Sequence, residues 1–118
     1  MSKLKVGVVG PCAAGKSTLV AGLVQRGYWG KPIAQEHSYV KDMWKRISNP
    51  DVLVYLDVSY PLTIQRRKLE WTEDEYLEEI RRLRHAGQHA NLYLNTDAFT
   101  AQEVLFEVLT FLEITGSR

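Results

Sequence analysis

Short runs of apolar, β-branched residues alternate along the chain with segments whose apolar positions recur every three or four residues. The runs predict strands and the periodic segments predict helices, and this alternation is typical of an α/β domain with a parallel sheet. We expect strands at about Lys3–Val9, Ile33–Glu36, Val52–Val58 and Asn91–Asn95. The third run is almost wholly apolar, which predicts a strand buried on both faces.

The first expected helix follows the first strand and stops at Gly27, with an apolar face made of Leu19, Val20, Leu23 and Val24. The next helix ends before Asn49-Pro50, and its apolar positions are Val40, Met43, Trp44 and Ile47. Pro61 suits the first turn of a short helix, because its fixed φ angle matches the helix and its missing N–H breaks no bond there.

Two further helices begin at capping boxes, in which a threonine and a glutamate three residues later satisfy each other's backbone N–H groups. Thr72 and Glu75 form the first box, and the helix after it has an apolar stripe made of Tyr76, Leu77, Ile80 and Leu83. Its outer face pairs Glu78 with Arg82. Thr100 and Glu103 form the second box, and the helix after it buries Val104, Leu105, Val108, Leu109 and Leu112.

Length, composition and charge narrow the class of protein. A chain of 118 residues can bury one core, so we expect a single domain over residues 1–118. The net charge of +1 gives no reason to expect a nucleic-acid or membrane partner, so any attraction to phosphate has to be local. No apolar run approaches the roughly 18–20 residues of a bilayer span, and the lone Cys12 cannot form an intramolecular disulfide. We therefore expect a cytoplasmic protein.

The segment after the first expected strand carries the most specific chemistry. Gly10-Pro11-Cys12-Ala13-Ala14-Gly15-Lys16-Ser17 satisfies the pattern G-x-x-x-x-G-K-[ST] at every fixed position. A β-branched strand leads in and an amphipathic helix leads out. Phosphate binding requires this context, because the backbone N–H groups of the loop and the positive end of the helix dipole converge on the phosphate oxygens. A glycine-rich turn with a surface lysine is the weaker alternative.

The pattern assigns roles within this loop. Lys16 places a positive charge against the β- and γ-phosphates, and the Ser17 hydroxyl is a Mg²⁺ ligand. We expect a nucleoside triphosphate to bind with Mg²⁺, ATP in preference to GTP. The expected nucleotide-binding residues are Gly10, Ala13, Ala14, Gly15, Lys16, Ser17 and Thr18. Cys12 is either a thiol activated by the helix N-terminus or, more simply, loop filler.

A triphosphate site also needs a carboxylate near the metal, at the carboxyl end of a strand beside the loop. Glu36 and Asp57 each stand at the end of an expected strand. For Asp57 a turn-forming role is an equal alternative.

Three segments resemble the thymidylate kinases and deoxynucleoside kinases, which are P-loop nucleotide kinases. Asp51-Val52-Leu53-Val54-Tyr55-Leu56-Asp57-Val58-Ser59-Tyr60-Pro61 looks like their fourth strand with its Tyr-Leu-Asp-Val-Ser-Pro-type ending. Glu36-His37-Ser38 looks like the Glu-Arg-Ser of the deoxynucleoside kinases, with histidine in place of arginine. Leu92-Tyr93-Leu94-Asn95-Thr96-Asp97 resembles the last strand and the turn into the last helix, so the resemblance covers most of the chain.

The resemblance implies a P-loop NTPase three-layer sandwich around a small parallel sheet of strand order 2-1-3-4. It implies that Glu36 contacts the Mg²⁺ shell or acts as the base on an acceptor hydroxyl, so Ser17 and Glu36 are the expected metal residues. Arg66, Arg67 and Lys68 fall where an arginine-rich lid begins. The expected catalytic residues are Lys16, Glu36, Arg66 and Arg67.

The expected activity is transfer of a γ-phosphoryl group to a small acceptor. The chain departs from the kinases before its second strand, where Gly27 to Pro32 replace a strand and helices that build the acceptor site. The alternative is a non-catalytic nucleotide-binding or regulatory module, or a slow NTPase. A GTPase-type switch is disfavoured, because the sequence has no Asn-Lys-x-Asp run to read guanine.

Other groups allow two interpretations. The balanced charges of Gln65–His85 favour a solvated, salt-bridged face over a triphosphate clamp for Arg81, Arg82 and Arg84. For Arg66 and Arg67 the two interpretations are equally open. His85 and His89 suit a surface pair better than a metal site, because no third ligand is near them in sequence. Packing in the core or an interface is expected, with a base-binding or partner-binding wall as the alternative, for Tyr28, Trp29, Tyr39, Trp44, Tyr60 and Trp71. A homodimer is one way to cover the edges of so small a sheet.

Overall fold

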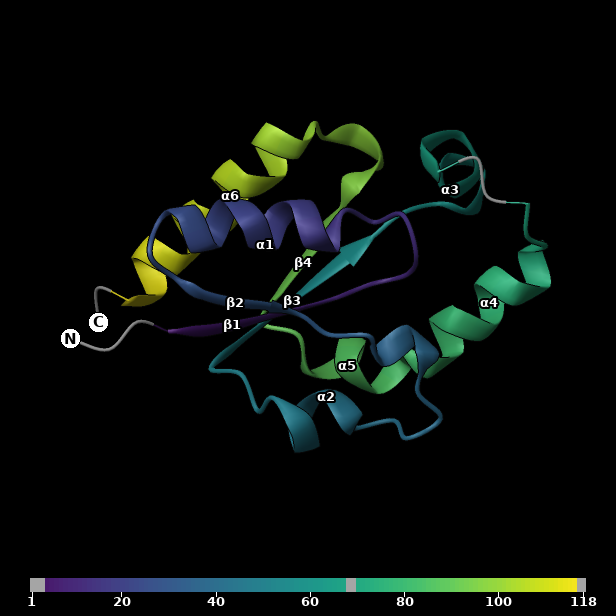
Figure 1. Cartoon of the computed structure of the whole chain (residues 1–118), viewed down its shortest axis with the longest axis horizontal. Coiled ribbons are helices and arrows are strands. Elements are labelled where there is room, and N and C mark those ends of the chain that lie inside the picture. The colour runs from purple at the N-terminus through teal and green to yellow at the C-terminus, as the bar shows by residue number, and fades with distance from the viewer. Residues whose placement is uncertain (1–3, 68–69, 117–118) are drawn as a thin grey trace.

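The computed structural model describes residues 4–67 and 70–116. Helices and strands alternate along most of the chain (Figure 1). In chain order the elements are β1 (Lys5–Val9), α1 (Lys16–Gln25), β2 (Trp29–Pro32), the 3-10 helix η1 (Gln35–His37), α2 (Met43–Ile47), β3 (Val52–Asp57), α3 (Tyr60–Arg67), α4 (Glu73–Arg82), α5 (Arg84–His89), β4 (Leu92–Asn95), the 3-10 helix η2 (Thr96–Ala98) and α6 (Ala101–Gly116).

The described strands form one parallel sheet in the order β2-β1-β3-β4. β1 therefore lies inside the sheet, where Val8 is in register with Pro32 on one side and Val54 on the other. This confirms the predicted α/β class, the parallel pairing and the strand order. Because the strands are parallel, their carboxyl ends share one edge, and the loop after β1 leaves from that edge.

The two faces of the sheet are covered by different helices, which gives three layers (Figure 1). On one face, α1 and α6 pack over alternate residues of the two central strands. This cluster contains Val6, Val8, Ala14, Leu19, Leu23, Val52, Val54, Leu56, Val58, Val104, Val108 and Leu112. On the other face, α2 and α5 pack over the intervening residues. The second cluster contains Val9, Ile33, Trp44, Leu53, Tyr55, Leu83 and Ala86.

The predicted second strand, Ile33–Glu36, is wrong in position. β2 ends at Pro32, the Ile33 N–H still donates to the Val8 carbonyl at 2.8 Å, and the chain then turns into η1. The cause is the buried Gln35 side chain, whose amide donates to the Val40 carbonyl and accepts from the Trp44 N–H, both at 2.8 Å. These bonds stabilise a turn in place of further ladder pairing.

Both capping boxes are present, and the predicted Glu78–Arg82 pair forms at 3.2 Å. The apolar stripe after Thr72 is only partly right, because Leu77 is 44% exposed whereas Glu79 is 7% exposed. Likewise Val24 of α1 faces solvent. The helix that begins after Thr72 also ends at Arg82, and α5 follows it as a separate short helix.

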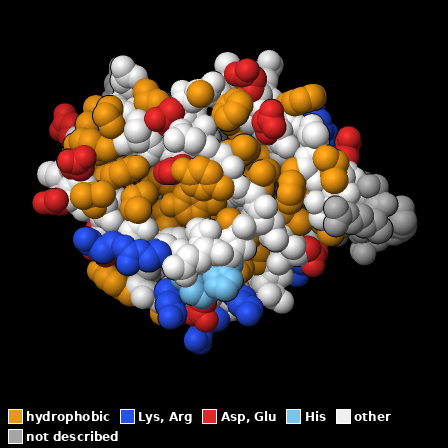
Figure 2. Space-filling model, turned by 180° about the vertical axis from the view of Figure 1, so that it is seen from behind, with side chains coloured by type: hydrophobic (Ala, Val, Ile, Leu, Met, Phe, Trp, Pro, Cys, Tyr) orange, Lys and Arg blue, Asp and Glu red, His pale blue; other side chains and the backbone are white. Residues whose placement is uncertain are grey.

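Apolar side chains remain on the surface as well. Figure 2 shows them spread across the middle of the rear face, above histidine atoms bordered by lysine and arginine. The large exposed apolar residues include Tyr39, Ile47, Tyr93, Phe106 and Ile114. Among the described residues, every helix is too short or too polar to cross a bilayer.

The different environments of two helical leucines give a matched test of this fold. Leu23→Ala removes a side chain that is 0% exposed, so the free energy of unfolding should fall by about 2–5 kcal/mol. Leu77→Ala changes the same atoms in an exposed position and should cost no more than about 0.5 kcal/mol. Denaturant unfolding of both variants measures the difference, and equal losses would contradict the packing described here.

Candidate functional site

The loop between β1 and α1 is shaped by two glycines. A Cβ atom on residue 10 would overlap the carbonyl oxygen of Leu56 in β3, so only glycine fits between the two strands there. Gly15 has a φ of 93°, in the left-handed region that glycine adopts without strain, and Ala13 has a φ of 71°. No side-chain bond caps α1 at Gly15, and its first turn holds no acidic residue. The positive end of the helix dipole therefore faces the loop without a protein counter-charge in that turn.

Lys16 folds back across this loop. Its Nζ donates to the carbonyls of Gly10 at 2.6 Å and Pro11 at 3.2 Å, and it forms an ion pair with Glu36 Oε2 at 2.7 Å. The pair is well shielded, because the Glu36 side chain is 5% exposed. The structure thus brings together the two residues that the sequence assigned to phosphate and metal, although Glu36 lies in η1 rather than in a strand.

Glu36 is only partly satisfied by protein. Among the described residues, its Oε1 is buried and has no hydrogen-bond partner. Its backbone is held from α4, because Arg82 Nη1 donates to the Glu36 carbonyl at 3.3 Å. A buried carboxylate oxygen without a donor is costly, and it is suited to accept a water or a cation.

Two hollows adjoin the loop on opposite sides. The first, of about 240 Å³, lies towards α6 and is mostly apolar; its lining includes Ala13, Thr18, Leu19, Arg66, Thr96, Phe99 and Val104. The second, of about 400 Å³, lies towards η1 and is lined by Cys12, Ala13, Ala14, Gly15, Lys16, Ser17, Thr18, Glu36 and His37. Ser17 and Thr18 are exposed at the start of α1, and every residue expected to bind nucleotide except Gly10 lines the second hollow.

Arg66 reaches the loop from α3. Its guanidinium donates to the Ala13 carbonyl at 3.3 Å, to Thr96 Oγ1 at 2.9 Å and to the Thr96 carbonyl at 2.6 Å. Thr96 in turn donates to the Asp57 carbonyl at 2.8 Å, which ties the turn after β4 to the end of β3. The side chain of Arg67 and the whole of Lys68 lie outside the described part of the chain.

Asp57 contributes to turn structure. Its carboxylate accepts from the Val58 N–H at 2.9 Å and from the hydroxyl of Tyr93 on β4. Burial, together with this bond, raises the pKa of Tyr93 to about 12, so the phenol keeps its proton at neutral pH and donates. These bonds correspond to the turn-forming alternative for Asp57.

Sequence reasoning missed Glu79 and Gln35. Glu79 Oε1 accepts from the Cys12 N–H at 3.0 Å, and Oε2 accepts from the Cys12 thiol at 3.1 Å. Gln35 joins η1 to α4 as well, because its Nε2 also donates to the Arg82 carbonyl at 3.3 Å. Both contacts span more than forty residues. No local sequence pattern predicts these contacts. A glutamate on a charged helix, for example, usually faces water.

The arginines and histidines agree with the sequence-based predictions only in part. Arg81 is exposed and pairs with Glu78 at 2.6 Å, as predicted. Arg82 keeps its predicted pair with Glu78 but is only partly exposed, and its guanidinium carbon lies 4.3 Å from the centre of the Tyr39 ring. The His85 and His89 rings lie in contact, tilted by 39° with centres 4.4 Å apart, and His85 accepts a hydrogen bond from the Trp44 Nε1–H.

Most of the aromatic residues pack rather than line the hollows. Trp44 is in the core, and Trp71 meets Tyr76 edge to face while its Nε1 donates to Thr63. Trp29 lies under the Lys5 ammonium, 5.2 Å from the ring centre. Phe99 alone among the large aromatic residues appears in the lining of the two hollows beside the loop.

No protein-family model matches the chain, and no curated protein matches it either. The function therefore has to be inferred from the geometry of the site.

The thiol of Cys12 gives a test of this geometry by pH. Partial burial raises the pKa of Cys12 to about 11, and the Glu79 carboxylate acts in the same direction, opposite to the lowering that a helix-activated thiol requires. Because only the thiolate reacts, alkylation in the presence of a chelator should accelerate about tenfold per pH unit up to about pH 10. Mass spectrometry gives the rate without ambiguity, because Cys12 is the one cysteine.

A free cysteine peptide, with a pKa of about 8.5, is the control and should level off near pH 9. Glu79→Gln removes the negative charge and should raise the rate at pH 8. A wild-type profile that already levels off at about pH 9 would show that Cys12 does not face Glu79 as described.

Proposed function

We propose that this protein is a P-loop nucleotide-binding protein of the nucleotide-kinase type, which binds a nucleoside triphosphate with Mg²⁺. One observation carries the proposal. A loop with the full G-x-x-x-x-G-K-[ST] pattern leaves the central strand of a parallel sheet, and its Lys16 ammonium meets the buried Glu36 carboxylate at 2.7 Å.

The phosphates are proposed to lie over the second hollow, against the loop. The α1 N-terminus and the backbone N–H groups from Gly15 to Thr18 supply donors, as helix N-termini do for anions. Lys16 would exchange its contacts with the Gly10 and Pro11 carbonyls for phosphate oxygens, which carry more negative charge. Because the net charge is only +1, the attraction to phosphate is proposed to come from the loop itself.

The residues beside the loop fit Mg²⁺, which prefers hard oxygen ligands. The Ser17 hydroxyl and the Glu36 carboxylate line the same hollow, and Glu36 Oε1 is buried without a protein donor. When bound, the ion would neutralise charge on the phosphates. Glu36 would hold it directly or through water, while its other oxygen keeps Lys16 in place.

The base is proposed to occupy the first hollow. That cavity is mostly apolar, it shares Ala13, Ala14, Gly15 and Thr18 with the phosphate side, and it offers Arg66 and Thr96 as polar groups. An arginine held in place by Thr96 can stack on a planar ring or donate to phosphate. The Asn-Lys-x-Asp run that reads guanine is missing, so we propose ATP in preference to GTP.

In the proposed reaction, the bond between the γ-phosphorus and the leaving diphosphate oxygen breaks, and a bond to an acceptor oxygen forms. Lys16 would stabilise the negative charge that spreads over the transferred group. Glu36 would take the acceptor's proton when it is not engaged with the metal.

A second candidate is a nucleotide-binding module without transfer activity. One observation favours it. β2 begins at Trp29, only a short turn after α1 ends at Gln25, so no additional element is present there to enclose an acceptor. Binding is common to both candidates, and turnover separates them.

Nucleotide binding is tested first. Calorimetric titration of ATP and GTP with Mg²⁺ should give saturable binding, and Lys16→Ala should weaken it at least tenfold, about the value of a lost charge-assisted hydrogen bond. Lys16→Met keeps the length of the side chain and should behave alike. Lys45→Ala, on the exposed side of α2, is the matched control and should bind as wild type. Normal binding by both Lys16 variants would refute the proposal.

Turnover is tested second. The release of γ-phosphate from the triphosphate is measured with and without nucleosides, nucleotides and small alcohols as acceptors. If the protein is a kinase, one acceptor class should accelerate loss of ATP, and Glu36→Gln should lower kcat by about 100-fold, because it removes the base and the metal carboxylate together. Asp57→Asn should change kcat far less. Tight binding with no turnover on any acceptor identifies the second candidate instead.

A further inference from the structure

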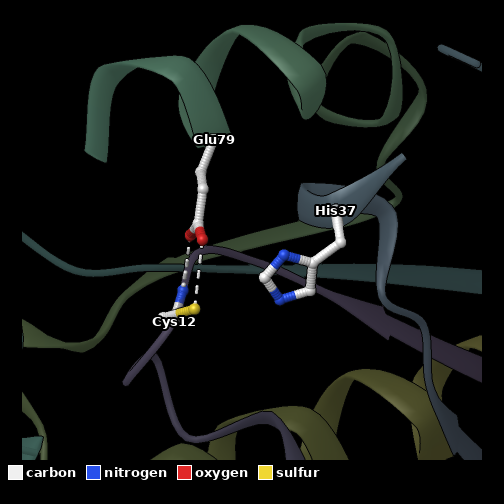
Figure 3. Close-up of side chains that lie close together, drawn as sticks. All are labelled: Cys12, His37 and Glu79. Atoms are coloured by element: carbon white, nitrogen blue, oxygen red, sulfur yellow. Dashed lines mark hydrogen bonds between the residues drawn. The ribbon is translucent and has the colours of Figure 1, made fainter. Parts of the chain in front are cut away.

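Three side chains with metal-binding atoms converge beside the phosphate loop from separate parts of the chain (Figure 3). Cys12 belongs to the loop, His37 ends η1 and Glu79 points down from α4. One donor atom from each lies within 4.8 Å of the other two. Figure 3 shows the Glu79 carboxylate directly over the Cys12 sulfur, with the His37 ring beside them.

The charges around this cluster favour a cation. Glu79 is 7% exposed, and in the described part of the chain its carboxylate accepts hydrogen bonds from the backbone N–H and the thiol of Cys12. Within the described ranges it has no ion-pair partner. The Lys16 ammonium is already paired with Glu36, whose Oε1 is itself unsatisfied. A bound cation would supply the opposite charge that the buried Glu79 carboxylate lacks.

The donor atoms select the kind of cation. Mg²⁺ takes oxygen ligands, whereas a sulfur, an imidazole nitrogen and a carboxylate oxygen together suit Zn²⁺ and similar thiophilic divalent ions. We propose that Cys12, His37 and Glu79 form a binding site for a Zn²⁺-class cation. Its donor set differs from the oxygens of Ser17 and Glu36, although Cys12 and His37 line the same hollow, and it does not depend on nucleotide binding.

The cluster is close to the shape that such an ion requires. Ligand atoms around tetrahedral zinc are about 3.3–3.8 Å apart, given bond lengths of about 2.0–2.3 Å. The Cys12 sulfur and Glu79 Oε2 are already 3.1 Å apart, and the His37 side chain, which is 59% exposed and lies 3.8 Å from Glu36 Oε2, would turn at the surface to close the remaining distance. When the ion binds, a metal–sulfur bond replaces the S–H bond and the proton passes to solvent. Three protein ligands leave a fourth position for water.

Bound at this place, the ion would join α4 to the phosphate loop. The direct link between them among the described residues is the Cys12–Glu79 pair of hydrogen bonds, and metal–ligand bonds would replace its thiol half. Metal occupancy would then set how firmly α4 is held over the loop.

The proposal is tested by metal binding alone, with the whole chain and no nucleotide. Titration with Zn²⁺ against a colorimetric chelator, in excess Mg²⁺, should give one tight site. Co²⁺ should show a near-ultraviolet thiolate charge-transfer band, which reports sulfur ligation directly. Even a substitution of a residue that only supports a metal ligand lowers metal affinity by about ten- to hundredfold. Loss of a ligand itself, in Cys12→Ala, His37→Asn or Glu79→Gln, should therefore lower Zn²⁺ affinity at least tenfold.

Matched controls keep the test specific. Glu73→Gln changes an exposed glutamate on the same helix, and His89→Asn disrupts the surface histidine pair; neither should alter Zn²⁺ affinity. Cys12→Ser keeps the hydrogen bond to Glu79, and circular dichroism checks that it and the other variants are folded. A Co²⁺ spectrum without the thiolate band would overturn the proposal. So would affinity that survives Cys12→Ala but is lost in His89→Asn.

Discussion

The close approach of β1 and β3 at Gly10 is the constraint on which the rest of the site depends. A side chain at this position would collide with the Leu56 carbonyl and push the two central strands apart. The loop would move with the strands. Because the Gly10 carbonyl accepts a hydrogen bond from the Lys16 ammonium, Lys16 would then lose its orientation towards Glu36. One missing methyl group thus connects the packing of the sheet to the electrostatics of its carboxyl edge.

Much of the fold could be predicted from local pattern. The β-branched run into Gly10, the apolar run from Val52 and the two capping boxes each depend on neighbours in sequence, and each is where it was expected. The prediction was wrong where tertiary contacts override local preference. Gly30-Lys31-Pro32 has little strand character, yet it pairs with β1 because the chain returns to that strand directly after α1. Glu79 is buried on a charged helix because its partner is the loop.

The residues of the candidate site likewise divide into those that the sequence predicts and those that only the folded chain brings together. Lys16, Ser17 and Glu36 could be selected from sequence because phosphate and metal chemistry restrict the residue types, and the structure places them around one hollow. Arg66 could be placed only by analogy, and its contacts with Ala13 and Thr96 depend on how α3 crosses the loop. The Gln35 and Cys12–Glu79 contacts could not be predicted at all, since they join segments that meet only in the folded chain.

The way in which α4 is attached has a consequence for how the protein moves. Several of its bonds to the body are polar: the Tyr76 hydroxyl to the Val58 carbonyl, Glu79 to Cys12, and Arg82 to the Glu36 carbonyl. Such bonds can be exchanged for bonds to water at little net cost, whereas the helices over the β1–β3 core cannot leave without exposing apolar surface. We therefore expect α4 to detach and return many times during the lifetime of an intact core, and its amide hydrogens to exchange before those of β1 and β3.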